Sequence, residues 1–337
     1  MKFEDFVSGK YKQQFQYKSF TPTKVNHEWT WDDARINVLL EEATRMLGEL
    51  NAFTLIVPDI DRFIRMHIAK EANTSSRIEG TRTNMDEVVL TEDDILPERR
   101  DDWREVQNYI KAMGVAIENL KELPLSLRLL KQTHATLLTS VRGASKLPGE
   151  FRTSQNWIGG ASISDAAFVP PHHLELPDLL SDLEAFWHND TIQVPHLIRI
   201  AISHYQFETI HPFLDGNGRI GRLLITLYLV SHGLLEMPSL YLSAFFEKYR
   251  TAYYDALSRV RESNDIGHWC RFFLKAIIEI SKSGKQTFTN IFALQKSVDG
   301  QLLTLGRRVA NGQKLILELY KNQVITSQDV MRICGIQ

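Results

Sequence analysis

The segment from His211 to Arg222 gathers most of the side chains in this sequence that could carry out chemistry, and it reads HPFLDGNGRIGR. The imidazole of His211 can exchange a proton close to neutral pH. The carboxylate of Asp215 is a hard oxygen ligand of the kind that Mg²⁺ shares with phosphate groups. Arg219 and Arg222 are spaced i, i+3, so on a helix they share one face, where each guanidinium can bind phosphate oxygens.

The tripeptide Gly216–Gly218 lies between two apolar segments, where a loop leads into the start of a helix. Its flexible backbone lets amide N–H groups point at an anion, and the positive end of the helix dipole adds to this preference. Taken singly, the histidine indicates a helix cap, the glycines a turn, and the arginines solvated ion pairs. Their joint occurrence within 12 residues is explained most simply by one bound anion, and it predicts phosphoryl or nucleotidyl transfer.

The same segment resembles the signature of the Fic (filamentation induced by cAMP) family, HPFx[D/E]GNGRxxR, and matches it at every defined position. The resemblance covers most of the chain, from about Phe20 to Ile280. It implies a protein adenylyltransferase that uses ATP and Mg²⁺ and transfers AMP to a Tyr, Thr or Ser hydroxyl of a target protein, or of the chain itself. Two alternatives remain: transfer of a different phosphate-containing group, and a transcriptional regulator that only binds the nucleotide.

The resemblance also implies a role for each matching residue. His211 would be the general base that deprotonates the target hydroxyl for attack on the α-phosphorus, and Asp215 would hold Mg²⁺ between the α- and β-phosphates. Arg219 would contact the β-phosphate and Arg222 the γ-phosphate, while a buried Phe213 would anchor the loop. The anion cradle would consist of the amides of Gly216, Asn217 and Gly218 together with the Asn217 side chain.

Residues 75–80, SSRIEG, match a second pattern of the family, [S/T]xxxE[G/N], which marks an inhibitory helix. Glu79 would lie at the negative end of that helix, where a nearby cation stabilises a carboxylate. The resemblance implies that this cation is Arg222, and that Ser75, one turn earlier on the same face, braces the pair. Glu79 would then inhibit the protein by occupying the γ-phosphate site. On the short pattern alone, a surface glutamate before a C-cap glycine is the alternative.

Residues 156–173 contain two short apolar and aromatic runs around a small, turn-rich centre, which indicates a β-hairpin or a surface loop. In the family, a flap beside the active site clamps the target by strand-like main-chain pairing. The target-docking flap implied here consists of Gly160, Ala161, Ser162 and Ile163. Tyr253 and Tyr254 match a family stretch near the adenine pocket, and packing in an aromatic core is the alternative for them.

Helical periodicity dominates the elements that must position these residues. The periodic segments are 31–50, 61–79, 103–120, 126–140, 176–188, 194–208, 220–231, 247–262 and 266–281. Periodicity therefore predicts a mainly all-α protein. The resemblance implies a Fic fold, with a helical core and a small β-hairpin flap.

Charge changes sign towards the C-terminus. The chain carries 39 Lys and Arg against 41 Asp and Glu, whereas residues 281–337 contain eight basic and three acidic residues. We expect an N-terminal helical region with the inhibitory helix (1–100), a Fic catalytic domain (101–280) and a C-terminal helical segment (281–337). The last segment resembles an incomplete winged helix-turn-helix, with helices at 315–320 and 328–333, a cap at Thr326 or Ser327 and an end at Gly335.

Composition bounds the remaining possibilities. Of 337 residues, 43% are hydrophobic and 24% charged, which excludes a disordered or fibrous protein. Only two cysteines, Cys270 and Cys334, occur, which argues against a disulfide framework and predicts a cytoplasmic protein. The most apolar stretch, 223–235, is too short to span a bilayer, so no membrane partner is expected. A homodimer is conceivable, and DNA is a partner only if a complete winged helix-turn-helix exists.

Overall fold

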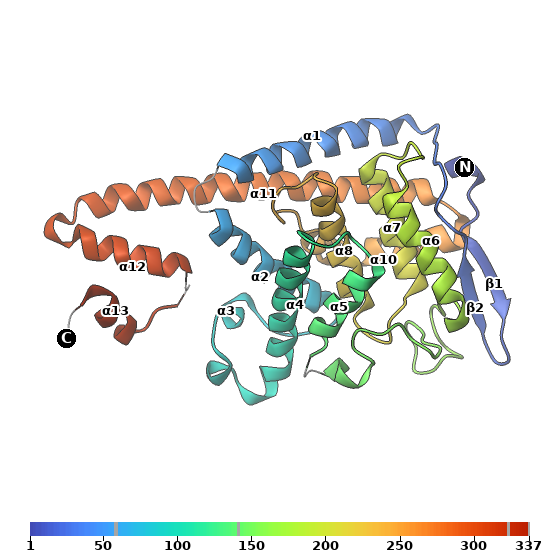
Figure 1. The fold of residues 1–337 in the computed structure, drawn as a ribbon, viewed down its shortest axis with the longest axis horizontal. Coiled ribbons are helices and arrows are strands. Elements are labelled where there is room, and N and C mark those ends of the chain that lie inside the picture. The colour runs from blue at the N-terminus through green and yellow to red at the C-terminus, as the bar shows by residue number, and fades with distance from the viewer. Residues whose placement is uncertain (57–59, 140–141, 322–323, 336–337) are drawn as a thin grey trace.

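The computed structural model describes residues 1–56, 60–139, 142–321 and 324–335, and this part of the chain is mainly helical, as predicted (Figure 1). The helices are α1 (Ala34–Ile56), α2 (Ile60–Ile78), α3 (Met85–Val88), α4 (Arg100–Asn119), α5 (Leu127–Leu137), α6 (Leu176–His188), α7 (His196–Ile210), α8 (Asn217–Ser231), α9 (Ser243–Lys248), α10 (Arg250–Ser263), α11 (Ile266–Leu303), α12 (Val309–Lys321) and α13 (Ser327–Cys334). Two strands, β1 (Gly9–Gln13) and β2 (Lys18–Pro22), form an antiparallel pair.

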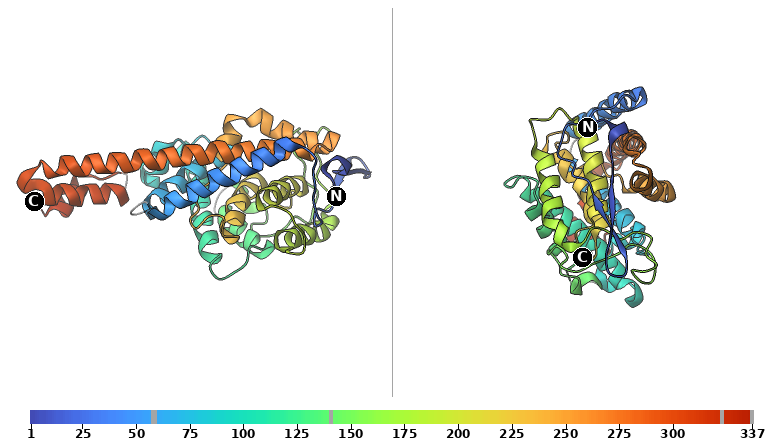
Figure 2. Two further views of the ribbon diagram at one scale, coloured as in Figure 1. Left: turned by 90° about the horizontal axis from the view of Figure 1, so that it is seen from above. Right: turned by 90° about the vertical axis from the view of Figure 1, so that its right-hand side faces the viewer.

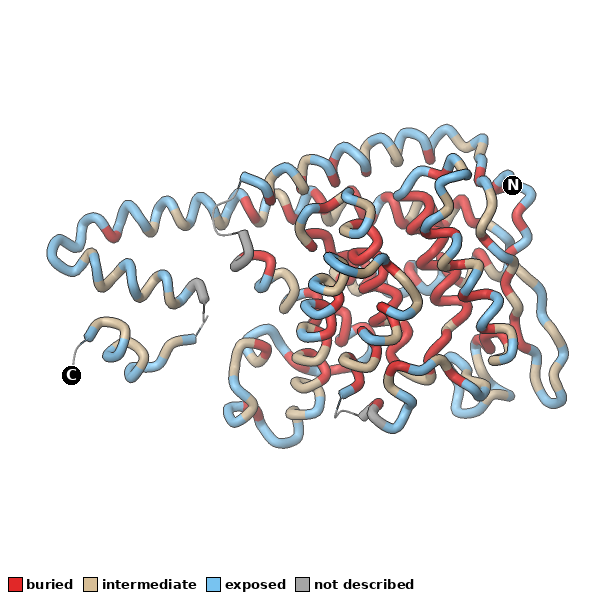
Figure 3. The backbone as a smooth tube through the Cα atoms, viewed as in Figure 1, coloured by how far each residue is buried: buried red, intermediate tan, exposed pale blue. Residues whose placement is uncertain are grey.

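Helices α7 and α8 form the centre of the core, where the backbone is almost continuously buried (Figure 3). Every residue of α7 after His196 is buried, and so is every residue of α8 from Asn217 to Leu229 except Gly218. A helix that is buried on every side is surrounded by close-packed side chains, which restrict its movement. The loop between α7 and α8 is therefore held at both ends by rigid, tightly packed helices.

Helix α11 runs beside α1 along one side of the molecule and extends beyond the core (Figures 1 and 2). We expected this helix to end at Ser281, but it continues to Leu303. The continuation has partners: a Cβ at Gly284 would lie 3.1 Å from the Leu50 side chain of α1, and the buried Phe288 ring lies 6.4 Å from that of Phe63 on α2. Within the described ranges, no helix, α11 included, is long and apolar enough to cross a membrane.

The two-stranded hairpin lies at the N-terminus and was not foreseen from the sequence. Its register pairs Tyr11 with Phe20, whose rings pack edge to face at 5.1 Å. Beside it, the Phe20 N–H donates to the Val169 carbonyl at 2.9 Å, which joins β2 to the segment where we expected a hairpin. The fold therefore contains one small two-stranded hairpin among the described residues, at residues 9–22, whereas the flap was predicted to be a hairpin at residues 156–173.

Residues 156–173 form a looped flap with a single antiparallel pair, Ile158 and Phe168, linked by hydrogen bonds of 2.8 and 3.1 Å. The centre of the flap is not extended because the Asp165 carboxylate accepts the N–H groups of Ala161 and Ser162, at 2.9 and 2.7 Å. These side chain-to-backbone bonds replace strand pairing with a tight turn. The structure thus favours the loop alternative over a regular hairpin for this segment.

The C-terminal helices follow the predicted end signals. Thr326 caps α13, with its hydroxyl accepting the Asp329 N–H at 3.2 Å, and Gly335 ends the helix in the left-handed conformation (φ 65°). The preceding helix, α12, begins at Val309, six residues before the expected start. The described residues between 281 and 335 thus include α12 and α13 in the expected order, after the last part of α11. The expected division of the chain into three regions stays a prediction.

Candidate active site

The loop at residues 211–216 turns the chain from α7 into α8. His211 caps α7 in the left-handed conformation (φ 50°) and donates its N–H to the Phe207 carbonyl at 2.9 Å. Gly216 (φ 74°) adopts the same conformation just before α8 begins. The first amide N–H groups of a helix have no acceptor within it, so the start of α8 presents donors and a positive dipole end at this loop. This is the loop and helix start expected from the sequence.

The Asn217 side chain closes this loop. Its Oδ1 accepts the Phe213 N–H at 2.8 Å, and its Nδ2 donates to the Phe213 carbonyl, also at 2.8 Å. Both ends of the carboxamide are therefore bound to one backbone unit, and the second Nδ2 proton is not used by these bonds, so the role of the side chain in the anion cradle stays a prediction. At the start of α8, the amides of Asn217 and Gly218 have no acceptor within the helix, whereas the Gly216 amide donates to Asp215. Phe213 is fully buried, as expected.

His134 on α5 packs against the loop and supports it. This residue was not predicted from the sequence. Its ring stacks on that of Phe213 at 3.8 Å, and its Nε2 lies 3.0 Å from the Asp215 carbonyl. Because Nδ1 accepts the Gly149 N–H at 2.9 Å, the ring proton is on Nε2, which donates to Asp215. Burial lowers the pKa of His134 to about 4, so the ring is neutral and structural at pH 7.

Arg152 is a second supporting residue that the sequence did not reveal. Its guanidinium is buried and donates to the carbonyl groups of His211 (3.0 Å), Pro171 (2.6 Å) and Ile210 (3.3 Å). These bonds tie the end of α7 to the base of the flap. The Asn156 side chain adds bonds to the His211 and Phe213 carbonyl groups, at 3.2 and 2.9 Å. The flap is thus fixed against the loop.

His211 has the protonation state that a base requires. Its Nδ1 lies 3.3 Å from the Glu208 carbonyl, so Nδ1 carries the ring proton and Nε2 is left as the acceptor. Burial is the main cause that lowers the pKa of His211 to about 4, with the bond to Glu208 opposing it. The imidazole is therefore neutral at pH 7 and can accept a proton at Nε2.

Asp215 is the only carboxylate of the loop, and a carboxylate is the type of ligand that suits Mg²⁺. Its Oδ1 accepts the Gly216 N–H at 2.6 Å and lies 3.8 Å from Nη2 of Arg219, and 45% of its side chain is exposed. Within the described part of the chain, no three His, Cys, Asp or Glu residues cluster as a metal site. A single open carboxylate fits an ion that is shared with substrate phosphates, because Mg²⁺ is commonly held in this way.

The two arginines of α8 lie on the same side of the helix start, and each is paired with a carboxylate from another element. Nη1 of Arg219 lies 3.1 Å from Oε2 of Glu105 on α4, and both side chains are buried. Nη2 of Arg222 lies 2.7 Å from Oε1 of Glu79, just after α2. The structure thus brings together the predicted arginines and the predicted inhibitory glutamate.

Ser75 completes the contact between α2 and α8. Nε of Arg222 donates to the Ser75 hydroxyl at 2.8 Å, and Nη2 donates to the Ser75 carbonyl at 2.9 Å. Burial opposes the ionisation of Glu79, but the charge and hydrogen bond of Arg222 outweigh it and lower the pKa of Glu79. Glu79 also lies directly against the start of α8, because a Cβ added at Gly218 would lie 2.3 Å from Oε1 of Glu79. The carboxylate therefore occupies space directly beside the expected cradle.

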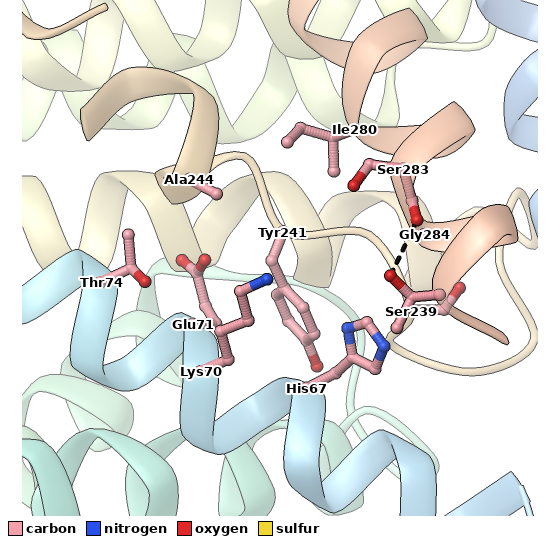
Figure 4. Close-up of a pocket in the computed structure, with 11 residues that line it drawn as sticks. His67, Lys70, Glu71, Thr74, Ser239, Tyr241, Ala244, Ile280, Ser283 and Gly284 are labelled. Atoms are coloured by element: carbon pink, nitrogen blue, oxygen red, sulfur yellow. Dashed lines mark hydrogen bonds between the residues drawn. The ribbon is translucent and has the colours of Figure 1, made fainter. Parts of the chain in front are cut away.

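A further polar contact holds α2 two turns before Glu79. Glu71 is buried, and it accepts hydrogen bonds from the Tyr109 hydroxyl at 3.3 Å and from the Ser243 hydroxyl. Figure 4 shows Glu71 beside Tyr241 in the wall of a small cavity between α2 and α11. Glu71, Ser75 and Glu79 are spaced four residues apart, so one face of α2 carries all three contacts.

The two tyrosines assigned to an adenine pocket differ in how far they are buried. Tyr253 is buried, its hydroxyl lies 2.9 Å from Nε2 of His204, and its ring stacks on Phe246 at 4.3 Å. This is the core packing that the sequence left open as an alternative. Tyr254 is 41% exposed and retains a surface that a ligand could contact. Of the flap residues, Gly160, Ala161 and Ser162 are exposed and Ile163 is partly buried.

Comparisons with known proteins agree with this geometry. The model described as Fic/DOC family N-terminal matches residues 38–118, and the model described as Fic/DOC family matches residues 124–229. The chain is 34% identical over 125 residues to a protein named protein adenylyltransferase Fic from Culex quinquefasciatus, covering 37% of this chain and 22% of that protein. It is 28% identical over 197 residues to a probable protein adenylyltransferase from Aquifex aeolicus, covering 57% and 53%.

These relatives are longer than the matched region, since the chain spans about a fifth of the insect protein and about half of the Aquifex protein. Among solved structures, a Fic family protein from Desulfovibrio desulfuricans superposes with a TM-score of 0.64 at 22% identity, covering 94% of this chain and 87% of that one. Residues 134–508 of Fic-1 from C. elegans superpose with a TM-score of 0.56 at 20% identity, covering 78% and 74%. These solved structures share the fold, and the two family models, which together span more than half of the sequence, show that the chain belongs to the Fic/DOC family.

Proposed function

We propose that this protein is an adenylyltransferase that moves AMP from ATP to a hydroxyl side chain of a target protein. The observation that carries this proposal is the neutral His211 imidazole, with Nε2 free to accept a proton, beside a helix start that also holds Arg219 and Arg222. A base next to a concentrated anion site is what attack on a phosphate requires. The names of the curated relatives support the same activity.

In this mechanism, the target hydroxyl oxygen attacks the α-phosphorus while Nε2 of His211 takes its proton. The bond from the α-phosphorus to the bridging oxygen of the β-phosphate breaks, and pyrophosphate leaves. The backbone amides at the start of α8 bind the phosphate oxygens, and Arg219 and Arg222 neutralise the β- and γ-phosphates. Asn217 and Arg152 fix the loop that carries His211 in advance, so little reorganisation of this loop accompanies the transfer.

Mg²⁺ fits this site through Asp215, whose partly exposed carboxylate lies beside the helix start. Bound there, the ion would neutralise phosphate charge. The protein's own contribution is to hold the carboxylate in place, because the Gly216 N–H fixes one of its oxygens at 2.6 Å.

We also propose that the conformation described here is the inhibited one. Arg222 is 2% exposed and already bound by Glu79 and Ser75, so a γ-phosphate could reach it only after Glu79 withdraws. An ATP that enters beside the bound Glu79 would sit without its γ-phosphate contact, in a pose that is wrong for in-line attack. Loss of the Glu79 carboxylate should therefore activate the protein.

The test is incorporation of labelled AMP from ATP and Mg²⁺, followed by intact-mass analysis of the modified protein. Glu79→Gly should increase labelling over the wild type, and adding His211→Ala to it should abolish labelling. A mass increase of one AMP group would identify the chemistry without knowledge of the target. Nucleotide binding without release of pyrophosphate in any variant would instead indicate a regulator that only senses nucleotide.

The partners belong to the same proposal. We infer that the flap docks an extended segment of the target, which would have to replace Asp165 on the amides of Ala161 and Ser162 before it could pair with them.

Cys270 is buried and Cys334 partly buried, and both are free thiols, which supports a reducing compartment such as the cytoplasm. A homodimer and DNA binding through the C-terminal segment are further predictions that oligomer-state and DNA-binding measurements would check.

A further inference from the structure

Glu208 is a buried carboxyl group that the proposed mechanism does not use. It lies in the last turn of α7, three residues before His211, and is 8% exposed. Its Oε1 has no hydrogen-bond partner within the described residues, and a Cβ at Gly221 of α8 would lie 2.2 Å from that atom. Burying a carboxyl oxygen without a partner is costly, so its retention between the two central helices calls for a functional explanation.

Charged groups from three other elements act on this carboxyl. Arg222 on α8 and Arg261 on α10 favour its ionised form, whereas Glu79, after α2, opposes it. Tyr253 on α10 also faces this carboxyl group. On α7 itself, the backbone carbonyl of Glu208 accepts a hydrogen bond from Nδ1 of His211. Burial is the largest effect and raises the pKa of Glu208 to about 7, above its ordinary value of 4.5. Glu208 and Glu79 are therefore two carboxyl groups that both interact electrostatically with the Arg222 guanidinium.

We propose that Glu208 is a positioning residue that acts on Arg222. When Glu208 is protonated, Arg222 is free to bind the anion in front of it. When Glu208 is ionised, its carboxylate competes with that anion for Arg222. In the conformation seen here, that anion is the Glu79 carboxylate. In the active state it is the terminal phosphate of ATP, and this second half of the inference rests on the proposed function. Glu208 acts through Arg222 and touches neither the hydroxyl nor the phosphorus.

The consequence is a proton linked to anion binding. When a phosphate with more negative charge replaces Glu79 near Arg222, the neutral form of Glu208 becomes more favourable, so binding takes up a proton. Rising pH removes that proton and turns Glu208 into a rival of the nucleotide. Nucleotide affinity should therefore fall as the pH rises through the neutral range, although His211 remains neutral throughout that range.

Glu208→Gln separates this role from simple packing, because glutamine has the same shape and stays uncharged at every pH. We expect the Kd for Mg²⁺ and ATP, measured by calorimetry in the Glu79→Gly background, to weaken at least threefold between pH 6 and pH 9. With Glu208→Gln added, the Kd should stay constant within twofold. Glu41→Gln, which changes an exposed glutamate of α1, is the matched control and should retain the dependence.

A second measurement needs neither nucleotide nor catalysis. In the nucleotide-free wild type, the carboxyl carbon of Glu208, identified by its absence from the Glu208→Gln spectrum, should titrate near neutral pH in ¹³C NMR. A carboxyl already ionised at pH 6, or an unchanged pH dependence of the Kd in Glu208→Gln, would overturn the proposal. Failure of AMP transfer alone would overturn the proposed function and leave this titration intact.

Discussion

Replacing Glu79 with glutamine tests whether charge holds the protein in its inhibited conformation. The substitution keeps the shape that fills the space beside Gly218 but removes the charge that faces Arg222, 2.7 Å away. Because the amide oxygen can still accept one hydrogen bond, Glu79→Gln should release only part of the inhibition that Glu79→Gly releases. The difference between the two variants separates the electrostatic contribution from the steric one.

The expected magnitude follows from the burial of the two partners. Losing one member of a fully buried ion pair costs about 3 to 5 kcal/mol, whereas an exposed pair contributes about 0 to 1 kcal/mol. Here Arg222 is 2% exposed and Glu79 is 35% exposed, so the pair lies between these limits. We take about 2 kcal/mol, which raises the population able to bind the γ-phosphate, and hence AMP incorporation, about 30-fold.

The assay is the initial rate of labelled AMP incorporation at saturating Mg²⁺ and at ATP concentrations below its Kd. Glu247→Gln is the matched control, because Glu247 forms a pair of 2.9 Å with Arg77 at the same end of α2, and the Arg77 side chain is 51% exposed. This control should change the rate by less than twofold. An equal rate for Glu79→Gln and wild type, with Glu79→Gly active, would refute the electrostatic account and leave a purely steric one.

Three further substitutions test the surrounding contacts. Ser75→Ala removes the acceptor for Nε of Arg222 and should raise AMP incorporation about fivefold, since such a bond contributes about 1 kcal/mol. Arg152→Lys loses most of the bonds to the loop carbonyl groups; urea titration should show an unfolding free energy lower by about 2 to 3 kcal/mol, and incorporation should disappear. The pKa of Glu208, about 7 in the folded protein against 4.5 unfolded, means that stability is lost as the pH rises from 4.5 to 7. Urea titrations at pH 5 and 8 should show that Glu208→Gln removes this loss, up to about 3 kcal/mol.

The sequence was sufficient to predict which residues gather at the candidate site, but it did not reveal the residues that hold them in place. The segment from His211 to Arg222 is contiguous, so its spacing alone places the base, the carboxylate and the arginines on one loop and one helix start. His134 and Arg152 act on that loop from 81 and 59 residues away. In the sequence each is one polar residue among many, and only the tertiary fold reveals that its partners are backbone carbonyl groups.

The wrong expectations have a common physical cause. Short polar side chains can satisfy the backbone locally, and sequence patterns do not show which of them will do so. The Asn217 side chain, assigned to the ligand, also binds the backbone of Phe213, and Asp165 turns the predicted hairpin into a loop. Conversely, the strands at 9–13 and 18–22 have an unremarkable composition and owe their pairing partly to contacts such as that of Phe20 with Val169.

The two arginines also differ in how readily their carboxylate partners can leave, and under the proposed function this difference would make Arg222 the regulated one. Glu105 lies within α4 and its side chain is 9% exposed, so a Glu105 that separated from Arg219 would keep its charge in the core instead of moving it into water. Glu79 lies at the end of α2, with a third of its side chain already in solvent and Gly80 (φ 106°) next to it. Withdrawal of Glu79 hydrates its charge at once, and the phosphate that replaces it restores a partner to Arg222. Most of the free energy needed to open the site is therefore spent on breaking the contact between Glu79 and Arg222, which the nucleotide can replace.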